Sequence, residues 1–195
     1  MDTKSIEGVG VFAQHYPRVA AVITSRNEDK SNAMAAAWHT PVSYQPPLFA
    51  VAVAPKRFSY RLISASKEFA VNFMPASKAE DVAALGGSEG ESLDKLRTFH
   101  ISHDRPVKIL APILRLAYAA YECRLIDDKL YGDHRLLVGE IVAVHWQKDS
   151  FMEDGSLDLT RVSPLLYIGN EHYISTESCT IRTLERQLCI ECLRG

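Results

Sequence analysis

The sequence predicts a mainly β protein whose strands pair largely antiparallel and close into a barrel. Seven or eight short apolar or β-branched runs follow one another at close spacing, with turn residues between them. Only one or two stretches carry a helical pattern. A doubly wound parallel sheet needs a helix for each crossover, so this pattern favours an antiparallel barrel.

Length and composition indicate one globular domain over 1–195. Hydrophobic residues make up 47% of the chain, which is typical of a protein with a real core, and no repeat or linker divides it. The formal net charge is −2, so the chain has no excess of basic residues. The sequence therefore does not predict nucleic acid or an anionic membrane as a partner. We expect no metal, because no three or four ligands converge in the sequence.

Targeting signals and cysteine usage predict a cytoplasmic protein with reduced thiols. No apolar run reaches the roughly 18 residues that span a bilayer, and the N-terminus lacks the basic and apolar regions of a secretory signal. The cysteines are too few and too unevenly placed for a disulfide scaffold: Cys123, Cys179, Cys189 and Cys192.

The first half of the chain predicts three strands. "RVAAVITSR" (18–26) is apolar and β-branched and stops in a polar turn, and "LFAVAVAP" (48–55) is bounded by prolines. Between them, "NAMAAAWHTPVS" (32–43) has alanines that suit a helix. Its Pro41 and the flanking strands favour an extended segment instead.

The middle of the chain alternates between helix and strand. "SYRLISASKEF" (59–69) predicts a short helix and "EFAVNFMP" (68–75) a strand. "SKAEDVAALGG" (77–87) predicts a helix that Ser77 caps and Gly86 ends. "SEGESLDKLRTF" (88–99) predicts a loop and turn.

The last part predicts two long strands, a hairpin and a helix. The runs 116–130 and 134–149 flank "LYGDH", and 165–175 holds the turn signal Gly169-Asn170. In the tail, apolar residues recur at helical spacing, which predicts an amphipathic helix that docks on the body or on a partner subunit: Ile181, Leu184, Leu188 and Cys192.

Several chemistry-bearing patterns favour ordinary structural roles. No standard catalytic or nucleotide-binding signature is present, and "LGGSEGES" follows a helix without the G-K-[ST] ending of a phosphate loop. The "HISHD" cluster (100–104) favours a solvated loop over a metal site. Cys189 and Cys192 favour a buried docking face over a redox dithiol or a metal half-site between subunits.

One stretch carries a stronger ligand signal. Lys56, Arg57 and Ser59 stand between a strand and a predicted helix, where two cations, a hydroxyl and helix-start amides suit a phosphate monoester. A solvated helix start that Ser59 merely caps explains the same residues equally well. The preceding small residues allow a planar ligand close to the backbone, although on these residues alone tight strand packing is the simpler interpretation.

Ordered motifs across 10–175 resemble the flavin reductase-like, FMN-binding split-barrel family, most closely its flavoredoxin-like branch. They are "SNAMAAAWHTPVSYQPPLFAVAVAPKRFS", "GGSEGESLDKL", "GDHRLLVGEI" and "PLLYIGNEHYIS". The resemblance implies a six-stranded antiparallel split β-barrel with Greek-key connections, short peripheral helices and a homodimer with FMN at the subunit interface. FAD stays open as an alternative, and the tail (178–195) lies outside the match.

The resemblance also implies roles for individual residues. The flavin ring is expected against Asn32, Ala33, Met34 and Ala35, with Thr40, Val42 and Ser43 lining it. The phosphate is expected on Lys56 and Ser59, with Arg57 near and Lys95 completing the clamp. Tyr167 covers the flavin and His134 lies near the nicotinamide. One departure is Leu96, where members of the family often carry Phe.

The implied activity is that of an NAD(P)H-dependent flavin reductase, which transfers hydride to flavin and can supply a separate monooxygenase. Two alternatives stay open. One is an FMN electron carrier that a protein partner reduces, and the other is a flavin store or sensor without turnover. The residues do not distinguish NADH from NADPH.

Overall fold

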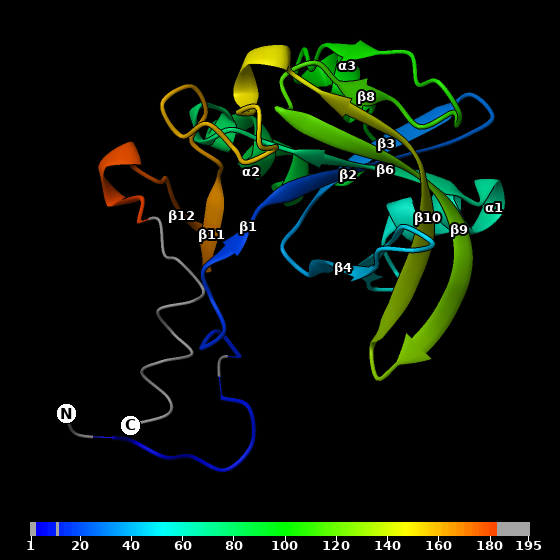
Figure 1. Ribbon diagram of the computed structural model, residues 1–195. Helices are drawn as coiled ribbons and strands as arrows, with labels where there is room; N and C mark the ends of the chain where they lie inside the picture. The colour runs from blue at the N-terminus through cyan, green and yellow to red at the C-terminus, as the bar shows by residue number, and fades with distance from the viewer. Residues whose placement is uncertain (1–2, 11, 183–195) are drawn as a thin grey trace.

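The computed structural model describes residues 3–10 and 12–182. Within them it forms twelve strands, three α-helices and three 3₁₀ turns (Figure 1). The predicted C-terminal helix, with Cys189 and Cys192, lies outside these residues apart from its start. The elements are β1 (Arg18–Val19), β2 (Ala21–Asn27), β3 (Lys30–Ala36), β4 (His39–Ser43), β5 (Leu48–Val53), α1 (Phe58–Ser66), β6 (Glu68–Phe73), η1 (Ala76–Lys78), α2 (Ala79–Gly87), α3 (Lys95–Thr98), β7 (His103–Asp104), β8 (Ile113–Leu114), β9 (Ala119–Tyr131), β10 (His134–Trp146), η2 (Lys148–Ser150), β11 (Leu166–Gly169), β12 (His172–Ile174) and η3 (Ser178–Thr180).

The main sheet has the strand order β3-β2-β6-β9-β10-β5-β4, and all its pairs are antiparallel. Its two outermost strands are consecutive in the chain, since only Ala37 and Trp38 separate β3 from β4. One Cα step is 3.8 Å, so three steps bring the two sheet edges within roughly 11 Å of each other. The sheet therefore closes into a barrel that is split between β3 and β4.

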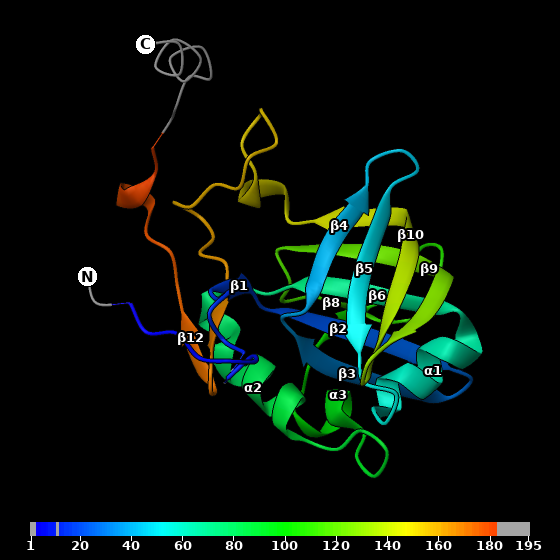
Figure 2. The same ribbon diagram turned by 90° about the horizontal axis from the view of Figure 1, so that it is seen from below.

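The main sheet holds seven strands where six were expected. The segment 32–43, predicted as one extended stretch, becomes two strands at opposite ends of the sheet order. The β9–β10 hairpin lies between β6 and β5, so the chain crosses from β5 to β6 through α1, as in a Greek key. Figure 2 shows α1 at the end of the barrel where β5 finishes.

Two apolar clusters bury opposite faces of β2. Ala21 and Ile23 point into the barrel, where they pack in one cluster with Ile63 of α1 and Phe69 of β6. On the other face, Val22 packs in a second cluster. This cluster includes Val82 and Leu85 of α2 and Leu165, which directly precedes β11. Burial on both faces explains why this strand reads as a continuous apolar run in the sequence.

A small second sheet stands beside the barrel next to α2 (Figure 1). Its order is β1-β11-β12, and β11 and β12 form the late hairpin that the sequence predicted. The predicted strand 18–26 divides at Ala20, because β1 pairs with β11 while β2 enters the barrel. The continuous segment 18–26 therefore contributes one strand to each of the two sheets.

The structure corrects three local predictions in the middle of the chain. Ser77 does not cap a helix, because it lies inside the 3₁₀ turn η1 that begins straight after Pro75. Helix α2 continues through Gly86 to Gly87, and Ser88 Oγ donates to the Ala84 carbonyl at its end. The predicted loop 88–99 contains the short helix α3, whose first turn is capped by Asp94.

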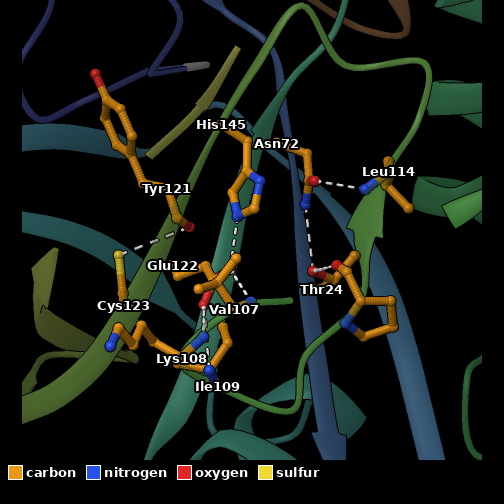
Figure 3. A network of polar contacts seen from close by, with 11 residues as sticks. Thr24, Asn72, Val107, Lys108, Ile109, Leu114, Tyr121, Glu122, Cys123 and His145 are labelled. Carbon is orange, nitrogen blue, oxygen red and sulfur yellow. Dashed lines mark hydrogen bonds and ion pairs between the residues drawn. The ribbon is translucent and has the colours of Figure 1, made fainter. Parts of the chain in front are cut away.

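A buried carboxylate fixes the long loop between β7 and β8 (Figure 3). Glu122 of β9 is fully buried and accepts hydrogen bonds from the backbone N–H groups of Val107, Lys108 and Ile109, at 2.6, 2.6 and 3.1 Å. His145 Nε2 of β10 lies 2.5 Å from the same carboxylate. Four partners around one carboxylate hold a loop that has little regular structure of its own.

Candidate functional site

Two adjoining cavities form one groove along β3. The narrower cavity has a volume of about 290 Å³ and the wider cavity one of about 440 Å³. The linings of the two cavities share Met34, Ala35, Arg57 and Gly86. Among residues 3–10 and 12–182, strand β3 pairs only with β2, and its other edge has no strand partner there. Residues from both faces of β3 line the groove, because the groove follows this free edge.

The wider cavity has a cationic end built by the turn before α1. Lys56 and Arg57 are exposed there, while the Ser59 side chain is fully buried. Helix α1 has Arg57 at its N-cap and no side-chain cap, so the interpretation that Ser59 merely caps the helix is wrong. Ser59 Oγ instead accepts a hydrogen bond from Asn32 Nδ2 at 2.8 Å, which joins the helix start to β3.

Lys95 brings a third positive charge to this cavity from α3. Its side chain is only 3% exposed, and Nζ donates to the carbonyls of Ala33 and Leu85 at 3.1 and 2.7 Å. Burial, with repulsion from Arg57, lowers the pKa of Lys95 to about 8. Among the described residues, no carboxylate forms an ion pair with Lys95, Lys56 or Arg57.

The loop after α2 packs tightly against this end of the groove. A Cβ atom on Gly90 would lie 2.0 Å from Asn32 Oδ1, so this loop position tolerates no side chain without movement. Asn32 is buried, and its Oδ1 has no hydrogen-bond partner among the described residues. Glu91 of the same loop pairs with Arg61, which removes one carboxylate from competition for the cations.

The narrower cavity has an aromatic wall. Tyr16, Trp38, Tyr167 and Tyr173 line it together with small residues of β3 and β5. Trp38 Nε1 donates to the Tyr16 hydroxyl at 3.3 Å, and the Tyr16 ring meets Tyr167 edge-on at 5.3 Å between centroids. His134 completes this wall, with its ring 4.9 Å from Trp38.

His134 stands at the start of β10, just after the hairpin turn. Its Nδ1 lies 2.7 Å from the Asp133 carboxylate, and this contact lowers the pKa of Asp133. The partner of His134 Nδ1 is thus a carboxylate and not a backbone group. The His134 ring faces the cavity while a carboxylate orients it, an arrangement that suits a group which positions a ligand.

The structure brings nine of the thirteen predicted site residues into the groove. They are Asn32, Met34, Ala35, Lys56, Arg57, Ser59, Lys95, His134 and Tyr167.

The other four predicted residues do not line the groove within one chain. Ala33 is fully buried under α2, with its carbonyl bonded to Lys95. Thr40, Val42 and Ser43 lie on β4, which pairs with β5 at the far end of the sheet order. The chain crosses the barrel opening at Ala37 and Trp38, so the residues that follow lie on the opposite side of the opening.

Sequence reasoning missed several groove residues, among them Trp38, Gly86, Gly90 and Tyr16. Trp38 ends the "NAMAAAW" motif and was visible as an aromatic beside small residues. Gly86 and Gly90 belong to the glycine-rich stretch, for which the sequence predicts a helix end at Gly86 and a loop after it, with no phosphate-loop signature. Tyr16 had no local signal, because its place in the wall depends on the pairing of β1 with β11.

Other site types find no support in the described residues. No group of three or more His, Cys, Asp or Glu residues is placed to hold a metal ion within 3–10 and 12–182. The helices of that part of the chain are also too short to cross a bilayer.

The groove suits a ligand with a planar ring at one end and a phosphate at the other. Three cations without carboxylate partners, one of them buried, provide a site for a phosphate group. Alanines at the β3 edge leave a flat surface, which the aromatic wall faces across the narrower cavity. The residues therefore fit FMN, and the fold and site define a split-barrel protein of the flavin-binding class.

Residues 13–176 match the flavin reductase like domain family. The chain belongs to this family, which confirms the resemblance seen in its motifs.

Solved structures confirm the fold, and one that is similar to this chain is described as having a split barrel domain. An FMN-binding protein from Thermus thermophilus, with p-hydroxybenzaldehyde bound, is 33% identical and superposes with a TM-score of 0.83, covering 94% of this chain and all of that one. The flavoredoxin of Desulfovibrio vulgaris (Miyazaki F) is 22% identical with a TM-score of 0.83, over 95% of this chain and 100% of that one. The latter likeness shows the fold alone.

A curated relative is a named reductase. The reductase component of the FADH2-dependent resorcinol hydroxylase of Rhizobium sp. is 26% identical over 147 residues, which are 70% of this chain and 78% of that protein.

Proposed function

We propose that this protein binds FMN and acts as an NAD(P)H-dependent flavin reductase. The observation that carries the proposal is the cluster of Lys56, Arg57 and Lys95 at one end of an otherwise small-residue and aromatic groove. Membership of the flavin reductase like domain family and the named Rhizobium reductase support the reaction class. The Thermus FMN-binding protein supports FMN as the flavin.

The cationic end holds the phosphate in this proposal. Lys56 and Arg57 approach it from the turn before α1, and Lys95 approaches from beneath β3. Charge-assisted hydrogen bonds of this kind favour FMN over riboflavin, which lacks the phosphate. Ser59, already bonded to Asn32, keeps the helix start and β3 in register around the site.

The aromatic end holds the ring. The backbone at Met34 and Ala35 forms one side, and Tyr167 covers the other. When bound, FMN supplies the hydride-accepting chemistry, which is why the chain needs no acid–base triad of its own. His134, oriented by Asp133, positions the nicotinamide of the hydride donor at the cavity mouth.

A second copy of the chain completes the site in this proposal. Val42 of β4 and Tyr44 of the turn that follows are 53% and 97% exposed, and neighbouring exposed side chains of this kind suit a protein interface. In a homodimer with the flavin at the interface, β4 of the second copy reaches the ring. This explains why Thr40, Val42 and Ser43 lie outside the groove of their own chain.

The alternative function is an FMN electron carrier that a protein partner reduces. The volume of the narrower cavity favours it: about 290 Å³ lies at the lower limit of small-molecule pockets. A ring that fills this space leaves little room beside it for a nicotinamide within one chain. A monooxygenase component or another redox protein is then the partner.

Anaerobic mixing separates the two functions. The FMN-loaded protein is mixed with NADH or NADPH, and the flavin absorbance near its visible maximum is followed. Bleaching on the time scale of turnover supports the reductase. Stable absorbance with both nucleotides contradicts the reductase and leaves the carrier.

A further inference from the structure

Lys95 has a hydrogen-bonding geometry that holds in two protonation states. Its Nζ donates to two backbone carbonyls, those of Ala33 and Leu85, at 3.1 and 2.7 Å. A neutral amine has two N–H groups and an ammonium has three. Both observed bonds therefore persist without the charge, and the third donor exists only in the protonated state.

The third donor of Nζ has no hydrogen-bond partner among the described residues. Lys95 lines the wider cavity together with Asn32 of β3, Ser59 of α1 and Arg57, which precedes α1. The amide nitrogen of Asn32 is bonded to Ser59, and Arg57 is itself a cation. A third proton on Nζ therefore gains little in the groove without an anion.

We propose that Lys95 is a proton-switched ligand of the phosphate, which takes up a proton from solvent when a phosphate dianion enters the groove. This inference rests on the proposed function, because it assigns the phosphate to this cavity. The same Nζ is bonded to β3, which faces the ring, and to the end of α2. Lys95 thus links phosphate binding to the two elements that form the groove.

The charged groups around Lys95 favour this exchange. From the turn before α1 come Lys56 and Arg57, and from α1 itself comes Arg61. From the loop after α2 come Glu89 and Glu91. On its own helix, Asp94 caps the backbone at Arg97. Since Glu91 pairs with Arg61, positive charge dominates near Nζ until an anion arrives.

The pH range in which FMN binding takes up a proton follows from the pKa of Lys95 with and without the ligand. Burial, with Arg57 beside it, lowers the pKa of Lys95 to about 8 in the protein without ligand. An adjacent dianion raises this pKa again, since it favours the charged form. Above pH 8, binding therefore requires proton uptake, and affinity falls as the pH rises. The second phosphate pKa, about 6, lies below this range.

Calorimetric titration with FMN and with riboflavin tests the proposal. At pH 9 the purified protein is titrated in buffers of different ionisation enthalpy, which reports the protons exchanged. We expect FMN to bind with uptake of up to about 0.9 proton, and with about 0.1 at pH 7. FMN should bind about tenfold more weakly at pH 9 than at pH 7. Riboflavin shares the ring titrations and should show no such uptake.

Two variants serve as controls. Lys95→Arg keeps its charge at every accessible pH, so FMN should bind without proton uptake. Lys95→Met should lose both the proton uptake and part of the FMN affinity. If Lys95→Met does not fold, the wild type and Lys95→Arg suffice.

The outcomes separate this inference from the proposed function. FMN binding at pH 9 without proton uptake overturns the role of Lys95 and leaves FMN binding intact. Equal uptake with riboflavin also overturns it, because the proton then follows the ring. A protein that binds no FMN at any pH overturns the proposed function and this inference with it.

Discussion

Lys56 carries an exposed positive charge on the turn before α1, at the cationic end of the groove. Because it forms no ion pair among the described residues, its charge is available to a phosphate. We expect Lys56→Ala to weaken FMN binding by about 1–3 kcal/mol, the value of a hydrogen bond to a charged group. Fluorescence titration with FMN measures the change.

Lys148→Ala is the matched control, since it removes the same charge on an exposed turn outside the groove. An equal loss of FMN affinity in both variants would mean that only the overall charge matters. Unchanged affinity in Lys56→Ala would remove Lys56 from the site.

Glu122 is the residue whose ionisation contributes most clearly to stability (Figure 3). Burial alone would raise its pKa, but the hydrogen bonds from Val107 N–H, His145 and Lys108 N–H outweigh burial and lower it. A lowered pKa stabilises the fold above the unfolded value near 4.3, and this stability is lost as the pH falls through the folded pKa. Acid should therefore release the loop between β7 and β8.

Glu122→Gln tests this anchor. We expect a loss of about 2–4 kcal/mol at pH 7, because an amide presents N–H groups to backbone donors. The difference from the wild type should shrink below about pH 4, where the carboxylate takes up its proton. Urea unfolding at several pH values measures both. Glu68→Gln, which removes the negative charge from the acceptor of a single bond from Leu110 N–H, should cost less. A pH-independent difference for Glu122→Gln would contradict the account.

Strand β10 contains a glycine that the barrel wall requires. A Cβ atom at Gly139 would lie 2.6 Å from Phe69 Cζ and 2.7 Å from Cys123 Cβ, and both side chains are fully buried. We expect Gly139→Ala to destabilise the protein by about 1–3 kcal/mol through overpacking. Gly87→Ala at the end of α2 meets nothing within 4 Å and should be neutral or stabilising by up to about 1 kcal/mol. Thermal unfolding that ranks the two variants in the opposite order would contradict this packing.

Element types were largely predictable, and element partners were not. The apolar runs at 18–26, 48–55 and 68–75 and the paired long runs after residue 116 became strands, because burial on one or both faces leaves a mark in the sequence. The division of 18–26 at Ala20 and of 32–43 at Trp38 left no such mark. Both depend on which strands lie alongside, and that is set by the closed barrel.

The candidate site followed the same division. The residues before α1 were recognisable because cations and a hydroxyl stood together in the chain. The aromatic wall was only partly recognisable, since Tyr16 and Trp38 meet through tertiary packing. The placement of Thr40, Val42 and Ser43 was not predictable for a single chain, because β4 crosses to the opposite edge of the split.

At the scale of the whole molecule, the exposed β4 edge predicts a dimer. Tyr44 is 97% exposed, and a carboxylate there is tolerated in a monomer but not in an apolar interface. We expect Tyr44→Glu to shift the protein from dimer to monomer and to weaken FMN binding. Light scattering after size exclusion gives the mass. A wild type that is monomeric at micromolar concentration would contradict the dimer, and Glu153→Gln, an exposed site elsewhere, should change nothing.

The central claim is that one groove holds a flat ring against β3 and a phosphate on Lys56, Arg57 and Lys95. Parallel equilibrium titrations of the protein with FMN and riboflavin at pH 7 test it most directly. The account predicts that FMN binds at least about tenfold more tightly, because only FMN brings the anion for which the three cations are unpaired. Equal affinity for the two flavins, or no binding of either, would contradict it.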